Sequence, residues 1–200
     1  MIKLRIAEKQ DIPGILEVYS EHVLKTAVSF EFELPSPEVF AKRFDEIRRK
    51  FPWLICEVNG TVAGFAYAKN YHEDAAYAWS AEITVYIGNN YQRKGIATFL
   101  YQCMERLLVL QGYYNLYAGI TGSNEKSLKF HKAQGFKEVG TYHNVGFKLG
   151  TWHDVVWFEK KLREYKADPW PPTKFSQLDV DEVNTILLDF SEKMSKKINL

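Results

Sequence analysis

A stretch near the middle of the chain constrains the fold most, because a strand and a long helix follow one another there with only a short loop between them. Residues 82–87 are rich in β-branched and aromatic side chains, which predicts a strand. After a polar loop, residues 94–111 have an amphipathic pattern that ends at Gly112. Its apolar stripe consists of Ile96, Phe99, Leu100, Cys103, Leu107 and Leu108. That stripe needs a sheet to cover it, so the stretch predicts an α/β domain.

The flanking sequence alternates between the two kinds of element. Strands are expected at residues 2–7, 53–58, 61–71, 114–120, 136–145 and 155–161, with Asn59-Gly60 as a hairpin turn. Helices are expected at about 11–25, from Ser36-Pro37-Glu38 onwards, and at 123–134. This order predicts a mixed, twisted central sheet with helices on both faces.

Proline divides the chain near its end. No proline occurs between Pro52 and Pro169, and three of the seven lie in the segment 169–172, which predicts a stiff linker. We therefore expect a main domain at 1–162 and, at 163–200, a proline-containing linker followed by an amphipathic C-terminal helix. Asp179 and Glu182 have the spacing of a capping box at the start of that helix. Its apolar seam, formed by Val180, Val183, Leu187, Phe190 and Met194, should pack on its own domain or across a dimer.

Charge and composition exclude several classes of protein. The net charge is +1, which argues against nucleic acid and anionic membrane as partners. The sequence has no apolar run of the roughly 18 residues that a membrane span needs, and its first residues carry charge where a signal peptide is apolar. Two cysteines form neither a disulfide framework nor a metal-ligand pattern. We therefore expect a cytoplasmic, globular protein without a metal.

Residues that suit phosphate binding stand where the central strand gives way to its helix. Gln92-Arg93-Lys94-Gly95-Ile96-Ala97 spans this junction. A helix start presents unpaired N–H groups and the positive end of the helix dipole, and glycine lets a phosphate approach the backbone closely. The alternative is a capping glycine beside two solvated cations. A second motif follows downstream, with Asn124, Ser127, His131, Gly135 and Phe136 at fixed spacing.

With these motifs in this order, the chain resembles the GCN5-related N-acetyltransferases (GNAT superfamily), and within them the phosphinothricin and methionine sulfone acetyltransferase branch. Further matches to that branch are the segments 51–54, 57–60, 81–86 and 146–155. The resemblance covers about residues 2–162. It implies the GNAT fold, acetyl-CoA as cosubstrate, a homodimer, and transfer of an acetyl group to the amino group of a small acceptor.

The resemblance also assigns catalytic roles. Glu82 matches the family's catalytic glutamate, and a carboxylate near the amine can take the proton that an ammonium must lose before it attacks a thioester. His131 stands where many relatives have a tyrosine that protonates the departing thiolate, and an imidazole can act there as acid or base. The alternatives are a solvent-facing glutamate at a strand start and a packed helix histidine.

Two further sets of residues follow from the family pattern. The cofactor-binding set comprises Val85, Tyr86, Ile87, Gln92, Arg93, Lys94, Gly95, Ile96, Ala97, Thr98 and Asn124. In the superfamily the strand of Val85–Ile87 separates from its neighbour and the pantetheine arm pairs with it, while 93–98 hold the diphosphate and Asn124 bonds the pantetheine. The acceptor-binding set comprises Phe30, His72, Asp74 and Tyr77.

Two of the acceptor positions depart from the branch. His72 and Asp74 stand where phosphinothricin acetyltransferases carry Lys and Arg, so we expect a less anionic acceptor than phosphinothricin. The alternatives are the same chemistry on a polyamine, an aminoglycoside or a protein N-terminus, and a coenzyme A-binding module without catalysis. His153-Asp154 is not expected to form a dyad, because neighbours on a strand point to opposite faces.

Overall fold

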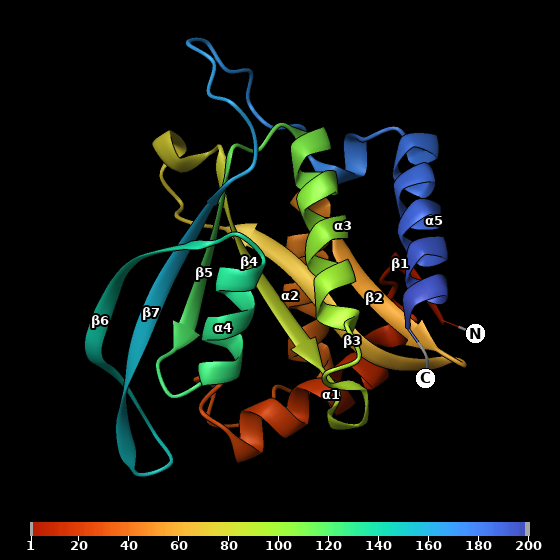
Figure 1. The fold of residues 1–200 in the computed structure, drawn as a ribbon. Helices are drawn as coiled ribbons and strands as arrows, with labels where there is room; N and C mark the ends of the chain where they lie inside the picture. Colours follow the sequence, from red (N-terminus) through yellow and green to blue (C-terminus); the bar gives the residue numbers. More distant parts are fainter. Residues whose placement is uncertain (1, 199–200) are drawn as a thin grey trace.

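The computed structural model describes residues 2–198 and contains a seven-stranded sheet in the order β1-β2-β3-β4-β5-β7-β6 (Figure 1). The strands are β1 (Ile2–Ile6), β2 (Trp53–Val58), β3 (Thr61–Asn70), β4 (Ser80–Ile87), β5 (Asn115–Thr121), β6 (Lys137–Lys148) and β7 (Thr151–Lys161). β4 and β5 run parallel, whereas the other neighbouring strands run antiparallel. The predicted mixed sheet is confirmed.

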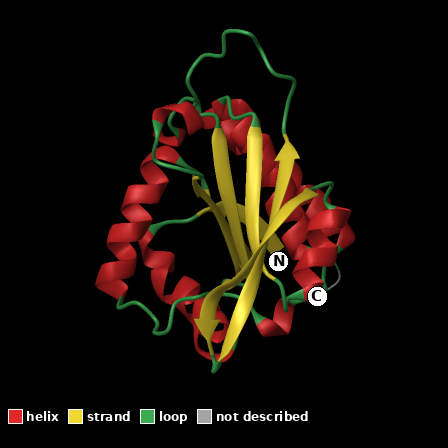
Figure 2. Ribbon diagram, turned by 90° about the vertical axis from the view of Figure 1, so that its left-hand side faces the viewer, coloured by secondary structure: helices red, strands yellow, loops and turns green. Residues whose placement is uncertain are grey.

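Helices cover both faces of this sheet, as predicted (Figure 2). α1 (Ile12–Lys25) and α2 (Pro37–Lys50) enclose one core, and α3 (Ile96–Gln111), α4 (Glu125–Ala133) and α5 (Val180–Lys197) enclose or border the other. Alternate residues of β2 divide between the two cores: Trp53 and Ile55 face α1 and α2, whereas Leu54 and Cys56 face α3. A strand that is buried on both faces explains the continuous apolar run in this part of the sequence.

Local chemistry fixes the element ends. Asn59 and Gly60 form the hairpin turn with φ of 50° and 84°, and the Ser36 hydroxyl accepts a hydrogen bond from Val39 N at the start of α2. α3 begins at Ile96, two residues later than predicted, because Arg93 and Gly95 have φ of 60° and 85° and cannot continue a right-handed helix.

The parallel strands separate soon after they pair. The register joins Ser80–Glu82 of β4 to Asn115–Tyr117 of β5 and ends there. From Ile83 to Ile87, β4 keeps its β3 neighbour but pairs with no described residue of β5. A wedge therefore opens toward the start of α3, with one backbone edge of β4 exposed in it.

α5 packs on its own domain, which is one of the two predicted arrangements. It lies along the edge strand β1 and beside α3, with Val183, Leu187 and Met194 buried, while Val180 is 70% exposed. Leu4 N donates to the Ser191 hydroxyl over 2.9 Å, and the Ser195 hydroxyl donates to Ile2 O over 3.2 Å. The helix thus covers the free hydrogen-bonding edge of β1, which would otherwise be open to pairing with another chain.

Candidate active site

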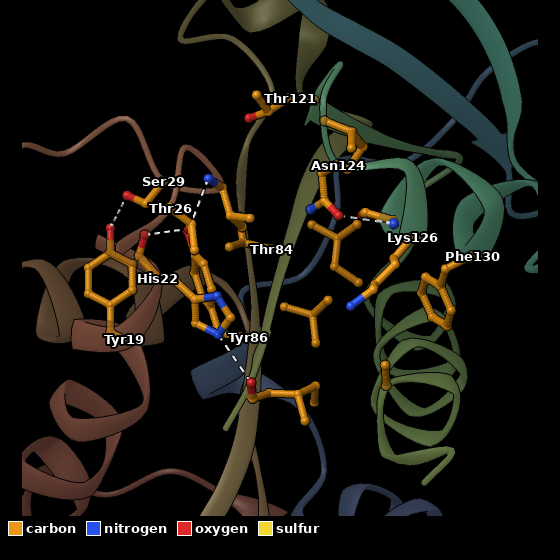
Figure 3. Close-up of a pocket in the computed structure, with 18 of the residues that line it drawn as sticks. Tyr19, His22, Thr26, Ser29, Thr84, Tyr86, Thr121, Asn124, Lys126 and Phe130 are labelled. Atoms are coloured by element: carbon orange, nitrogen blue, oxygen red, sulfur yellow. Dashed lines mark hydrogen bonds between the residues drawn. The ribbon is translucent and has the colours of Figure 1, made fainter. Parts of the chain in front are cut away.

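A cavity of about 1200 Å³ occupies the wedge between β4 and β5. Tyr19, His22, Thr26 and Ser29 line one side, and Asn124, Lys126 and Phe130 line the opposite side, with Thr84 of β4 between them (Figure 3). We call residues 26–31, which follow α1 on the first side, the acceptor loop.

The cofactor-binding residues predicted from the sequence gather at one end of this cavity. Within residues 2–198, all of them line it except Lys94, whose ammonium lies over the Tyr91 ring, 5.9 Å from its centroid. Gly95 is the N-cap of α3 and has φ of 85°, so the helix start approaches the cavity with no side chain on this residue. Successive N–H groups, the helix dipole and Arg93 suit a diphosphate.

The middle of the cavity is a slot along β4. Its free backbone edge can accept an extended chain as an added strand, which is the arrangement that the pantetheine arm needs. Opposite, Asn124 is the N-cap of α4: its Oδ1 accepts from Ser127 N over 3.2 Å, which leaves the Nδ2 group to donate. His22 lies at the α1 side, and its Nε2 donates to Ile87 O over 3.1 Å. Burial lowers the pKa of His22, so the ring is neutral.

The other end of the cavity carries charged side chains. Glu82 lies at the last paired position of β4, and Lys69, its cross-strand partner on β3, places Nζ 3.1 Å from its carboxylate. Arg43 of α2 also lines this end and pairs with Glu31 of the acceptor loop over 2.7 Å. Two cations and two carboxylates therefore face the same space, where a zwitterion could be held.

His131 is buried, with 1% of its surface exposed. Its Nδ1 lies 2.8 Å from Ser127 O, an acceptor only, so Nδ1 carries the proton. Its Nε2 then accepts from the Tyr101 hydroxyl over 2.6 Å. Burial lowers the pKa of His131 and raises that of Tyr101, so both groups are neutral. Both ring nitrogens are hydrogen-bonded, and Tyr101, the partner of Nε2, lines the cavity together with His131.

The predicted acceptor residues do not gather in one place. Phe30 lines the cavity, whereas His72, Asp74 and Tyr77 are absent from its lining as far as residues 2–198 define it. They lie on the exposed β3–β4 connection, where Tyr71 contacts both the His72 ring and Trp157, a cavity residue, at centroid distances of 4.6 and 6.0 Å. The Tyr71 ring thus lies between His72 and the cavity residue Trp157.

His153 and Asp154 do not pair with each other, as expected. His153 Nε2 donates to Lys148 O over 3.0 Å, while Asp154 accepts from Asn144 N over 2.8 Å and contacts His143 Nδ1 over 3.1 Å. These contacts shape the end of the β6–β7 hairpin.

Sequence reasoning missed Lys69, Arg43, His22 and Tyr101 as cavity residues. Lys69 alternates with Tyr67 along β3, so a period of two could have placed both on one face. Tyr101 lies within the buried part of α3 and looks like core, and only the three-dimensional contact with His131 reveals its partner.

Within residues 2–198, no cluster of three or more His, Cys, Asp or Glu side chains is placed to hold a metal ion. Over the same range, none of the helices has the length and apolarity to cross a membrane.

Comparison with known proteins agrees with this geometry. A family model described as an acetyltransferase (GNAT) domain matches residues 4–157. A phosphinothricin N-acetyltransferase of Streptomyces viridochromogenes is 30% identical over 177 residues, covering 88% of this chain and 96% of that protein. The L-methionine sulfoximine/L-methionine sulfone acetyltransferase of Salmonella typhimurium is 27% identical over 165 residues, covering 82% of this chain and 96% of that protein.

A solved structure adds the three-dimensional likeness. The GNAT superfamily phosphinothricin acetyltransferase of Sinorhizobium meliloti, in complex with acetyl-CoA, superposes with a TM-score of 0.80. It is 28% identical, and the match covers 87% of this chain and 98% of that one.

Proposed function

Because the chain belongs to the GNAT acetyltransferase family, we propose that its cavity binds acetyl-CoA along the free edge of β4 and that Glu82 deprotonates an amine held beside it. The protein is an acetyl-CoA-dependent N-acetyltransferase. The roles of individual residues and the acceptor are our proposals.

The cavity fits the cosubstrate at both of its distinctive parts. Arg93, Gly95 and the N–H groups that open α3 suit the diphosphate, and the edge of β4 that β5 leaves free after Glu82 suits the pantetheine, with Ile87 O already bonded to His22. Acetyl-CoA supplies an electrophilic thioester carbonyl. The chain's own task is to hold that carbonyl in the slot and to bring a neutral amine against it.

One observation carries the assignment of Glu82: the β4–β5 pairing ends at this residue. Its carboxylate therefore stands at the inner end of the slot, where a thioester that follows β4 must stop. The Lys69 ammonium lies 3.1 Å from this carboxylate and helps to fix its position. A carboxylate at this point can accept the amine proton directly or through one water.

The test replaces the carboxylate alone. Glu82→Gln should lower kcat by about 10²-fold or more, with little change in the acetyl-CoA dissociation constant, because the group serves the amine. The matched control is Glu73→Gln, an exposed carboxylate on the β3–β4 connection. Equal kcat for Glu82→Gln and parent between pH 6 and 9 would overturn the assignment.

We propose that His131 serves the departing thiolate through Tyr101: as the amine attacks, the amine proton that Glu82 does not take passes through the Tyr101 hydroxyl to His131 Nε2, and it returns by the same route to the thiolate. The Tyr101 hydroxyl bonds His131 Nε2 and also lines the cavity, so it is the group through which a proton can pass. Tyr101→Phe and His131→Ala should then slow turnover by similar factors, and the double variant should be no slower than either single variant. Additive losses would show that the two residues act separately.

For the acceptor we propose a small amino acid-like amine. Lys69, Arg43, Glu82 and Glu31 offer charges of both signs at one end of the cavity, which suits a zwitterion better than a strongly anionic molecule. The relatives named above act, by their names, on phosphinothricin and on methionine sulfoximine or sulfone. A panel of amino acids, polyamines and aminoglycosides, scored by thiol release at saturating acetyl-CoA, identifies the acceptor. Release no faster than in buffer for every amine would favour a binding module without catalysis.

We also propose a homodimer formed through the β6–β7 hairpin. Its outer surface exposes Val139, Tyr142, Val145, Phe147 and Trp152, and β6 is an edge strand. A patch of this kind is typical of a protein interface. Phe147→Asp should halve the mass measured by light scattering, whereas the control Leu188→Asp on α5 should not; the reverse result would place the interface on α5.

A cytoplasmic location is proposed as well. Cys56 and Cys103 are both buried and free, as in a protein of a reducing compartment.

A further inference from the structure

Besides its contacts with cavity residues, the acceptor loop is held by residues of the β6–β7 hairpin that are absent from the cavity lining as residues 2–198 define it. The loop follows α1 and contributes Val28, Phe30 and Glu31 to the cavity wall. Its backbone carbonyl groups, however, point toward β5 and the β6–β7 hairpin, and there they find polar partners.

The principal partner is Lys148, at the end of β6. This lysine is 3% exposed, and its ammonium donates to Val23 O over 2.7 Å and to Ser29 O over 2.5 Å. Val23 lies in the last turn of α1, where carbonyl groups lack helical partners and the helix dipole is negative. Burial lowers the pKa of Lys148 and the Glu31 carboxylate acts in the opposite direction. One ammonium thus ties the end of α1 to the middle of the loop.

Two more contacts complete the attachment. The Thr121 hydroxyl of β5 donates to Ala27 O over 2.6 Å. The Phe30 ring packs on Gly146 of β6 so closely that a Cβ added to this glycine would lie 2.6 Å from Phe30 Cζ. His153 in turn donates to Lys148 O and steadies the strand end that carries the ammonium.

We propose that Lys148 and Gly146 are positioning residues for the acceptor: the hairpin end sets the shape of the acceptor loop, and through it the affinity for the amine. This rests on the proposed function, in which the amine binds between the loop and Glu82. It gives a role to the segment 146–154, which neither the cosubstrate nor the catalytic groups explain. The contacts with the hairpin therefore hold the acceptor loop in one conformation.

The first test measures the loop directly and needs no activity. In Lys148→Met, amide hydrogen exchange across residues 26–31 should rise at least about tenfold, whereas exchange in α3 should stay as in the parent. The control Lys137→Met removes an exposed ammonium from the same strand and should change neither. Unchanged exchange in the loop of Lys148→Met would overturn the proposal, whatever the enzyme acetylates.

The second test separates positioning from simple loss of stability. Lys148→Met should raise the KM for the acceptor by about 10- to 100-fold, the scale of small misplacements near a reacting group, while the acetyl-CoA dissociation constant stays within twofold. Lys148→Arg should restore part of the acceptor affinity. Equal losses toward both substrates would mean that the lysine only stabilises the fold.

A double variant checks the steric half of the proposal. In the parent, Gly146→Ala should displace the Phe30 ring and raise the acceptor KM. In the Phe30→Ala variant, Gly146→Ala should raise the KM little further, because the ring that it would clash with is absent. Full additivity of the two losses would contradict the role of Gly146. If the parent turns over no amine while loop exchange responds as expected, the proposed function fails and the positioning of the loop stands.

Discussion

The two ends of the cavity differ in the groups that they offer for binding. At the cofactor end these are mainly backbone groups: the edge of β4 that β5 leaves free, the start of α3 and Gly95, all within the continuous stretch 83–98. At the acceptor end the binding groups are side chains, and they come from four separate segments: Lys69, Glu82, Arg43 and Phe30. Backbone geometry tolerates many side chains, whereas a constellation of side chains changes with each substitution. The chemistry of transfer can therefore be kept while the acceptor changes.

The largest effect expected at the cofactor end comes from its glycine. Gly95→Val should weaken acetyl-CoA binding by about 30-fold, because in the free variant the helix start relaxes away from φ of 85° and binding must restore that conformation, which costs a β-branched residue about 2 kcal/mol. Calorimetric titration with acetyl-CoA measures this change. Gly140→Val, at an open position without positive φ, is the control and should bind as the parent does. Normal binding by Gly95→Val would show that the helix start does not cradle the phosphates.

The next effect should fall on the acceptor end alone. Lys69→Met should lower kcat/KM for the acceptor by about tenfold, since it removes a charged partner of Glu82 and one of the two cations that face the acceptor. The affinity for acetyl-CoA should not change. Steady-state kinetics with the acceptor varied, and the exposed Lys166→Met as control, measure this effect. A matching loss of acetyl-CoA affinity would contradict the separation of the two ends.

This division also explains what the sequence could predict. The stretch 82–98 carries its own signals, a β-branched strand followed by Arg93, Gly95 and an amphipathic helix, so the fold class and most of the cofactor end follow from local patterns. Family resemblance predicts the roles of Phe30 and Glu82. Arg43 and Tyr101 were not found, because each looks like an ordinary helix residue until the strands bring its partner close. Lys94, chosen for its charge, turns instead to Tyr91.

The third expected effect is a dependence of stability on pH that comes from a histidine on each wall of the cavity. Burial lowers the pKa of His22 and His131, so both are neutral in the folded chain, whereas in the unfolded chain they take up protons near pH 6.5. Below that pH the unfolded state binds more protons, so stability should fall as pH drops, by at most about 1.4 kcal/mol per pH unit for His131. Urea unfolding between pH 7.5 and 5 measures the slope.

Matched variants assign that slope to its residues. His22→Gln keeps a donor for Ile87 O but cannot be protonated, so the pH dependence should become shallower. His131→Gln makes the same test of the α4 wall. The same slope in His22→Gln and parent would mean that the α1 wall does not contribute, and that the pH dependence comes from the α4 wall.

The smallest effect is expected from the outermost acceptor residue. The family resemblance predicts a cation at the position of Asp74 in the phosphinothricin branch, but Asp74 is exposed and is absent from the cavity lining as residues 2–198 define it, so its charge acts on the acceptor through solvent. Asp74→Arg should therefore raise kcat/KM for phosphinothricin only about two- to threefold, and phosphinothricin should remain a poorer substrate than a less anionic amino acid. The specificity ratio of the two acceptors, measured in one assay at low and at high salt, decides the matter: a small gain that salt removes is a long-range effect. A gain of about 30-fold or more that survives salt would mean direct contact, and the β3–β4 connection would then have to close over the acceptor and belong to the acceptor end of the cavity.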